Sequence, residues 1–320
     1  MKKRELGHSG IMVPTLCFGG NVFGWTADTE RTFELLDALL ESGLNFVDTA
    51  DSYSHWAPGN KGGESETIIG QWFAARKNRA KVILATKVGS PMGDGKKGLS
   101  RKYIREEVEE SLRRLQTDYI DLYQSHRDDE STPQEETLKV YADLIREGKV
   151  RAIGCSNFTP ERLESALEVS RKENLPRYET LQPEYNLYDR AGYEQRLQGI
   201  CVKQGLGVIP YFSLASGFLS AKYHSAEEAA SRPRAGMLKK YFNERGMRIL
   251  QVLEEVSREV KAKPAQVALA WLMARPGITA PIASATNVEQ LQELVVATRL
   301  ELPKNVMERL NQASAETVSV

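Results

Sequence analysis

Four polar residues of different chemistry lie at or just after the ends of short apolar runs: Asp48, Tyr53, Lys87 and His126. Tyrosine has an ordinary pKa of about 10, which is too high for an efficient proton donor near neutrality. A neighbouring lysine would lower that pKa, and an aspartate paired with the lysine would hold it charged and in place. A histidine beside them could orient a carbonyl oxygen or relay a proton. The set suits protonation of an oxygen while a hydride arrives at the attached carbon.

Each of these residues also has an ordinary structural explanation. Asp48 could cap a turn, and Lys87 could extend from a strand end into water. Tyr53 could pack against a rim, and His126 could be a structural histidine. If the fold brings all four side chains to one place, a shared chemical role is favoured over four separate structural roles.

Eight β-rich runs alternate with longer helical stretches and define the expected architecture. The runs begin near Leu16, Asn45, Val82, Ile120, Val150, Thr180, Gly207 and Thr279. Most successive starts are about 30 residues apart, the length of one βα unit. We therefore predict a single α/β domain over residues 1–320. It is a (β/α)8 TIM barrel with a long insertion between strand 7 and strand 8 and extra C-terminal helices. In such a barrel all strands end at the same mouth.

Several helices have recognisable beginnings. Ser100 is predicted to cap a helix over 101–115 that has an apolar stripe. Thr132 and Thr159, each followed by proline, predict two further caps. The remaining charges of the first helix are expected to form a solvated face: Glu106, Glu107, Glu109, Glu110, Arg113 and Arg114.

The interval before the eighth run contains the polar stretch Ser225–Lys240. We predict a long exposed loop there, of the kind that often serves as a lid, followed by a helix from about Asn243. Two final helices are expected over 287–298 and 303–315.

Composition excludes several classes of protein. Among 320 residues, 43 Lys+Arg balance 43 Asp+Glu, which argues against a non-specific nucleic-acid binder. No apolar run is long enough to span a membrane. The three cysteines, Cys17, Cys155 and Cys201, are too scattered for a disulfide framework or a metal knuckle. We expect a cytoplasmic protein with no metal site.

Residues 93–98 match the GxGxxG pattern of dinucleotide-binding turns. In that fingerprint the glycines form the tight turn between strand and helix. Here Pro91 and its neighbours separate the preceding strand from the first glycine, and Ser100 begins the helix after the last one. A flexible loop is the favoured interpretation. A Rossmann dehydrogenase is the structural alternative, and it leaves the four polar residues unexplained.

Five motifs carry a resemblance to a known family: GLNFVDTA at 43–50 with Tyr53, GESE at 63–66, ATK at 85–87, DLYQSH at 121–126 and GKVRAIGCSNF at 148–158. With them the chain resembles the aldo-keto reductases over essentially its whole length. It is most similar to bacterial-type members of the branch that includes the potassium-channel β subunits. The family's catalytic tetrad falls on Asp48, Tyr53, Lys87 and His126, with Tyr53 as general acid. The resemblance implies NAD(P)H-dependent reduction of aldehydes or ketones to alcohols.

The resemblance also implies a nicotinamide cofactor bound in an extended form without a Rossmann fold. Ser156, Asn157 and Gln182 match positions that hold the carboxamide, and Tyr211 matches an aromatic that stacks on the nicotinamide ring.

The loop over the pyrophosphate and the segment at the adenosine end also have counterparts. Small residues in the loop would let backbone N–H groups approach the phosphates. Its matching positions are Ser213, Leu214, Ala215 and Gly217. At the adenosine end, Ser284 and Gln290 stand where many members grip the 2′-phosphate with Lys and Arg, and Thr286 is expected to add a further uncharged donor. NADP(H) is the expected cofactor, with NAD(H) as the alternative.

Aromatic residues in loops predicted at the mouth could wall a substrate pocket: Phe23, Trp25, His55 and Trp56. Covering the barrel rim is an equal alternative. Arg127 favours an anionic or polyol substrate, unless it pairs with Asp128 or Asp129. The expected binding partner is a small-molecule carbonyl or alcohol substrate. The sequence leaves open whether the chain forms a homo-oligomer. The alternative function is a cofactor-binding, redox-sensing regulatory subunit with little turnover.

Overall fold

The computed structural model of the chain describes residues 2–93, 95–230 and 235–316. Its central element is one sheet of eight parallel strands. The strands are β3 (Cys17–Gly19), β4 (Phe46–Asp48), β5 (Ile83–Val88), β6 (Ile120–Ser125), β7 (Val150–Ser156), β8 (Thr180–Gln182), β9 (Gly207–Val208) and β10 (Ile282–Ala283). Each lies close to the start predicted for it. From β3 to β9 the strands are paired in chain order, and β10 lies beside β3.

Backbone hydrogen bonds close this sheet into a barrel. At one end of the strand order, Ile282 of β10 pairs with Cys17 of β3. At the other end, the Thr279 N–H donates to the Val208 carbonyl at 2.7 Å, and the Ile282 N–H donates to the Pro210 carbonyl at 2.8 Å. The predicted eight-stranded α/β barrel is therefore confirmed.

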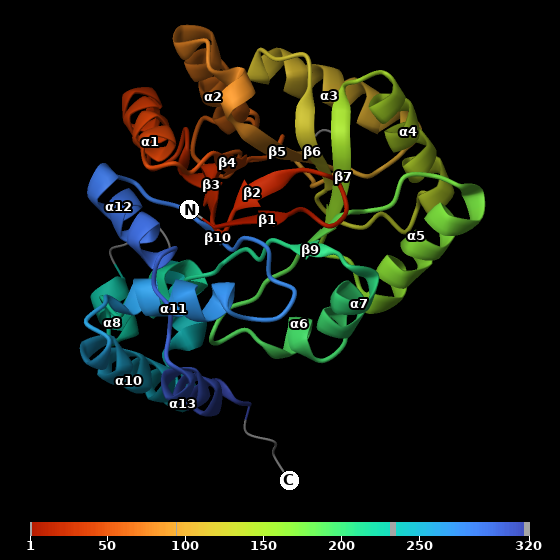
Figure 1. The fold of residues 1–320 in the computed structure, drawn as a ribbon. Coiled ribbons are helices and arrows are strands. Elements are labelled where there is room, and N and C mark those ends of the chain that lie inside the picture. Colours follow the sequence, from red (N-terminus) through yellow and green to blue (C-terminus); the bar gives the residue numbers. More distant parts are fainter. Residues whose placement is uncertain (1, 94, 231–234, 317–320) are drawn as a thin grey trace.

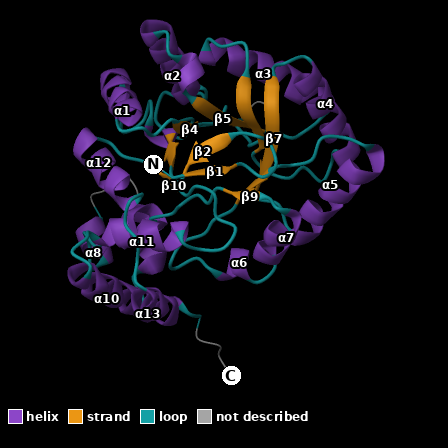
Figure 2. Cartoon of the chain, in the orientation of Figure 1, coloured by secondary structure: helices purple, strands orange, loops and turns teal. Residues whose placement is uncertain are grey.

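Helices surround the strands, as Figures 1 and 2 show. The first set comprises α1 (Thr29–Glu41), α2 (Glu64–Arg76), α3 (Arg101–Leu115), α4 (Gln134–Arg146), α5 (Pro160–Glu173), α6 (Ala191–Glu194) and α7 (Leu197–Gln204), with the short 3-10 turns η1 (Gly20–Val22) and η2 (Arg79–Lys81). After β10 come α12 (Val288–Ala297) and α13 (Lys304–Ser314), which match the two predicted final helices.

Between β9 and β10 the chain forms further helical elements: η3 (Ala215–Ser220), α8 (Ala226–Ala229), α9 (Ala235–Leu238), η4 (Lys239–Tyr241), α10 (Glu244–Glu259) and α11 (Pro264–Met273). The prediction of a loop over Ser225–Lys240 was therefore wrong for part of that segment. The Ser225 hydroxyl accepts a hydrogen bond from the Glu228 N–H and starts a helical turn. Residues 231–234 of the segment lie outside the described residues. The helix predicted from about Asn243 is confirmed, with Asn243 as its cap.

An antiparallel hairpin of β1 (Lys3–Glu5) and β2 (Met12–Pro14) precedes the barrel and was not predicted. Figure 1 shows it lying across the middle of the ring of strands. Arg4 donates to the Ile278 carbonyl at 2.6 Å, near the start of β10. Leu6 and Ile11 pack with residues inside the barrel. The hairpin closes the N-terminal end of the barrel, so the C-terminal ends of the strands form the open mouth.

The α3 helix shows one instructive difference from its predicted pattern. Its apolar stripe is buried as expected. Glu107 and Arg114, expected on a solvated face, instead lie at the contact with α2. Arg114 pairs with buried Glu66 at 2.7 Å and also with Glu107. The two helices cross so closely that a Cβ at Gly70 would lie 2.1 Å from the Arg114 carbonyl oxygen.

Local cap predictions gave mixed results. Ser100 and Thr159 cap their helices as predicted. Thr132 does not, because its hydroxyl donates to Asp129 at 2.7 Å and α4 begins after Pro133.

The described residues of the glycine-rich stretch, Gly93 and 95–98, precede the α3 helix and belong to a loop. The Gly98 N–H donates to the Gly89 carbonyl at 3.1 Å, and the helix begins only after Ser100. Asp94 lies outside the described residues. Among the described residues, no helix combines the length and the apolar character that crossing a membrane requires.

Candidate active site

Alternation along the barrel strands places polar side chains above an apolar layer. Successive residues of a strand face opposite sides, so positions two apart share the barrel interior. Phe46, Ala85 and Leu122 belong to the apolar cluster inside the barrel. Two residues further toward the mouth on the same strands stand Asp48, Lys87 and Gln124, all 0% exposed.

Lys87 is the centre of a compact hydrogen-bonded group. Its Nζ donates to Asp48 Oδ2 at 2.6 Å, to the Tyr53 hydroxyl at 2.8 Å and to the Thr49 carbonyl at 2.8 Å. The Tyr53 hydroxyl in turn donates to Asp48 Oδ2 at 3.2 Å. An ammonium group that donates three hydrogen bonds has its full donor capacity satisfied. The predicted pairing of Asp48 with Lys87 is therefore present in a fully buried setting.

The other oxygen of Asp48 is held by two amide side chains. Gln124 Nε2 donates to Asp48 Oδ1 at 3.1 Å, and Gln182 Nε2 donates to the same oxygen at 3.0 Å. Gln124 was not among the predicted site residues. Its position two residues before His126 and two residues after the inward-facing Leu122 of the same strand is the signal that could have identified it.

His126 follows β6 directly and lies beside the tyrosine. The two rings are 6.0 Å apart between centroids, in an edge-on arrangement. His126 Nδ1 lies 3.4 Å from the Ser52 hydroxyl oxygen. The structure thus brings all four predicted tetrad residues to one place at the mouth.

The electrostatic environment keeps both the tyrosine and the histidine neutral. Loss of hydration on burial raises the pKa of Tyr53 well above its usual value, and the Asp48 charge raises it further. This direction is opposite to the lowering expected from the neighbouring lysine. Burial, together with the positive charges of Lys87 and Arg127, holds the pKa of His126 well below its usual value.

The residues predicted to hold the nicotinamide carboxamide form a continuous hydrogen-bonded group next to His126. The Ser156 hydroxyl donates to the Gln182 carbonyl at 2.8 Å, and Asn157 Nδ2 donates to the His126 carbonyl at 2.9 Å. The Tyr211 hydroxyl donates to Asn157 Oδ1 at 2.9 Å. Asn157 has a left-handed backbone, with φ of 57°. The side-chain amide of Gln182 is directed at Asp48.

The loop predicted to cover a pyrophosphate has an unusual backbone. Ala215, Ser216 and Gly217 have successive positive φ values of 48°, 58° and 105°. The Ser213 hydroxyl donates to the Pro210 carbonyl at 3.1 Å and fixes the start of the loop. Leu214 packs against the apolar core. Backbone turns of this kind can present N–H groups to an anion.

The predicted adenosine-end residues lie at the beginning of α12. The Ser284 hydroxyl donates to Asn21 Oδ1 at 2.6 Å. The Thr286 N–H and hydroxyl both donate to Gln290 Oε1, at 3.0 and 3.2 Å. These side chains are partly exposed and uncharged.

Three of the predicted substrate-wall aromatics cluster beside Tyr53. The Trp56 ring is 5.7 Å from Trp25, 5.4 Å from His55 and 6.1 Å from Tyr53, and Trp56 is 44% exposed. The fourth, Phe23, does not line an open pocket as was expected. It is 0% exposed and stacks on the core residue Phe18, with 5.7 Å between the ring centroids.

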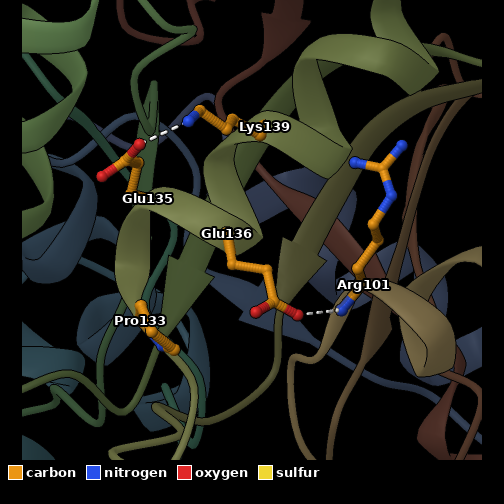
Figure 3. Close-up of a pocket in the computed structure, with 5 residues that line it drawn as sticks. All are labelled: Arg101, Pro133, Glu135, Glu136 and Lys139. Carbon is orange, nitrogen blue, oxygen red and sulfur yellow. Dashed lines mark hydrogen bonds and ion pairs between the residues drawn. The ribbon is translucent and has the colours of Figure 1, made fainter.

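A surface hollow elsewhere on the molecule has no part in this site. It lies at the N-terminal ends of α3 and α4 and is lined by Arg101, Pro133, Glu135, Glu136 and Lys139 (Figure 3). Glu136 accepts from the Arg101 N–H at 2.8 Å. Within residues 2–93, 95–230 and 235–316, no group of three or more His, Cys, Asp or Glu side chains is arranged to hold a metal ion.

Comparison with known proteins places the chain among similar oxidoreductases and channel subunits of one family. A sequence model of the Aldo/keto reductase family matches residues 15–315. The chain is 37% identical to the uncharacterized oxidoreductase YrpG of Bacillus subtilis, over 97% of this chain and 95% of that protein. It is 31% identical to L-glyceraldehyde 3-phosphate reductase of Escherichia coli, over 93% and 87%. It is 32% identical to a probable voltage-gated potassium channel subunit beta of Arabidopsis thaliana, over 92% and 90%. The matched region contains all eight barrel strands.

Proposed function

The chain belongs to the aldo/keto reductase family of oxidoreductases, and we propose that it reduces the carbonyl group of aldehydes or ketones to an alcohol with NAD(P)H. The observation that carries the proposal is the buried contact of Lys87 with both Asp48 and the Tyr53 hydroxyl at the open end of the barrel. This group can supply a proton at a defined point while it keeps a buried positive charge beside that point.

Tyr53 is the proposed general acid. Its raised pKa keeps the phenol protonated at neutral pH, so the proton is available at the hydroxyl oxygen. Lys87 and Asp48 fix the position of that oxygen, and the lysine charge stabilises the phenolate that forms when the proton leaves. The chain therefore protonates the carbonyl oxygen without any change in its buried ion pair.

His126 is the proposed orienting residue for the carbonyl oxygen. Its lowered pKa keeps the imidazole neutral. Nδ1 faces the Ser52 hydroxyl, which leaves Nε2 to hydrogen-bond with the substrate. A neutral imidazole can donate such a bond without supplying a competing proton.

The residues around the mouth fit a nicotinamide dinucleotide. When bound, this cofactor supplies the hydride. Asn157 and Ser156 are the proposed partners of the carboxamide, together with Gln182, whose Oε1 accepts no hydrogen bond within the described residues. The Tyr211 ring, held by Asn157, is the proposed stacking surface.

The phosphate groups are proposed to lie over residues 213–217. The Ala215 and Gly217 N–H groups already donate to the Phe212 and Leu214 carbonyls, so the proposal rests on the left-handed turn at Ala215 and Ser216 and on the small side chains there. At the adenosine end we propose NADPH, with Ser284, Thr286 and Gln290 as uncharged donors, and NADH as the alternative.

The experiment is a panel of aldehydes and ketones with NADPH and NADH, followed by absorbance of the reduced cofactor. Oxidation of NADPH with at least one aldehyde, and alcohol as product, is expected. A preference for NADH of tenfold or more would overturn the cofactor proposal alone.

The similarity to a channel β subunit favours a second candidate, a redox-sensing subunit. Tight cofactor binding with no turnover on any carbonyl in the panel would replace the reductase proposal by this one.

A further inference from the structure

Arg127 is a cation at the mouth of the barrel that serves no structural pairing. It follows His126 directly, beyond the end of β6, and its side chain is exposed. Within the described parts of the chain, no residue forms an ion pair or a hydrogen bond with its guanidinium group. A guanidinium presents five N–H donors in a planar fork that matches carboxylate and phosphate oxygens.

The carboxylates that follow Arg127 in the sequence are engaged elsewhere. Asp128 forms two hydrogen bonds with Arg162, at 2.6 and 2.9 Å. Asp129 accepts hydrogen bonds from Ser131 and Thr132 in its own turn. The alternative that Arg127 only neutralises one of these two acids is therefore wrong.

A second cation near the mouth behaves differently. Lys240 lies 3.0 Å from Glu184 and 3.3 Å from Asp189, so its charge is already balanced. The charge of Arg127 instead acts on groups of the site. It contributes to the low pKa of His126 and opposes the rise in the pKa of Tyr211, which burial takes to about 12.

We infer that Arg127 binds an anionic group, a carboxylate or a phosphate ester, on the carbonyl substrate that Tyr53 and His126 act on. The inference rests on the proposed function and specifies its substrate class as anionic aldehydes or ketones. Trp25 and Trp56 offer an aromatic wall beside Tyr53 for the uncharged part of such a substrate. Ion pairing with a guanidinium adds two parallel hydrogen bonds as well as charge attraction.

Matched probes that differ in charge test this inference. The first pair is 4-carboxybenzaldehyde and 4-formylbenzamide, and the second is 4-oxobutanoate and 4-oxobutanamide. We expect kcat/KM to be about tenfold or more higher for the anionic member of each pair, mainly through a lower KM. A third anion, 4-formylphenyl phosphate, tells whether phosphate or carboxylate is preferred.

The Arg127→Gln variant identifies the residue responsible. It should raise KM for the anionic probes about tenfold and bring kcat/KM of each anionic probe to within about twofold of its amide partner. Arg113→Gln on the outer face of α3, where Arg113 pairs with Glu110, changes the net charge equally and should keep the preference. Removing an exposed, unpaired side chain leaves the fold intact, and an unchanged melting temperature verifies this.

Binding measured without turnover separates this inference from the proposed function. Quenching of tryptophan fluorescence by 4-carboxybenzaldehyde should weaken about tenfold in Arg127→Gln, even if no probe is reduced. Equal quenching in both proteins, equal kcat/KM within each wild-type pair, or a preference that persists in the variant overturns the inference. A raised KM for NADPH in the variant, with the anion preference intact, would instead assign Arg127 to the cofactor.

Discussion

Replacing Lys87 with methionine removes the positive charge at the centre of the candidate site. The side chains of Lys87 and Asp48 are both 0% exposed, and their charged atoms are 2.6 Å apart. In the variant the Asp48 carboxylate keeps its amide donors Gln124 and Gln182 but has no cation. Breaking a buried ion pair from one side costs about 3–5 kcal/mol. At about 2 °C per kcal/mol, the melting temperature should fall by about 6–10 °C.

A double-mutant cycle with Asp48→Asn separates the ion pair from the other contacts of each residue. In Asp48→Asn alone, the amide N–H would face either the Lys87 ammonium or the amide donors of Gln124 and Gln182, donor against donor in both orientations. In the double variant no charge remains buried, so its loss should be smaller than the sum of the single losses by about 2 kcal/mol or more. Urea denaturation at pH 7 measures the free energies of unfolding.

An exposed pair provides the matched control for this cycle. Lys139 on α4 pairs with Glu135 at the surface, and Lys139→Met should change stability by less than about 0.5 kcal/mol. Strictly additive losses in the cycle, or a Lys87→Met protein as stable as the wild type, would refute the reasoning.

Three further outcomes follow from the structure. The pKa of His126 is lowered and that of Tyr53 is raised, so kcat/KM for reduction should show no inflection near pH 6.5. It should decline only in alkaline solution. A loss of rate centred near pH 6.5 would contradict this. Gly70→Ala places a Cβ against the α3 backbone and should cost about 1–3 kcal/mol in urea denaturation, whereas Gly192→Ala, which meets no atom within 4 Å, should be close to neutral. Asp51 is buried with neither carboxylate oxygen hydrogen-bonded in the described structure, and burial raises its pKa. The Asp51 carboxyl therefore ionises at a lower pH in the unfolded chain than in the folded protein, so the free energy of unfolding falls as the pH rises above about 4. In Asp51→Asn the melting temperature should fall less over the same pH range.

The positions of the strands and of the tetrad could be predicted because both depend on local patterns. Short apolar runs at βα spacing locate the strands, and parallel strands in a barrel must end at the same mouth. Asp48, Lys87 and His126 could be grouped from that rule alone, before any contact was known. The β1–β2 hairpin could not be predicted, because its three-residue strands carry little pattern of their own.

The errors arose where a tertiary contact decides the role of a side chain. Glu107 and Arg114 have the composition of a solvated helix face, and only the close approach of α2 at Gly70 turns them into a buried group. Phe23 has a loop sequence around it, yet it packs inward. The direction in which the pKa of Tyr53 shifts depends on how deeply the hydroxyl is buried, which cannot be read from the sequence.

The role of Tyr53 as proton donor is the central claim, and one comparison tests it most directly. Wild type and Tyr53→Phe are incubated with NADPH and 4-nitrobenzaldehyde, and both cofactor consumption and alcohol formation are measured. We predict one alcohol per NADPH in the wild type and a rate about 10²–10⁴-fold lower in the variant, with unchanged affinity for NADPH. A Tyr53→Phe rate within about twofold of the wild type would contradict the account.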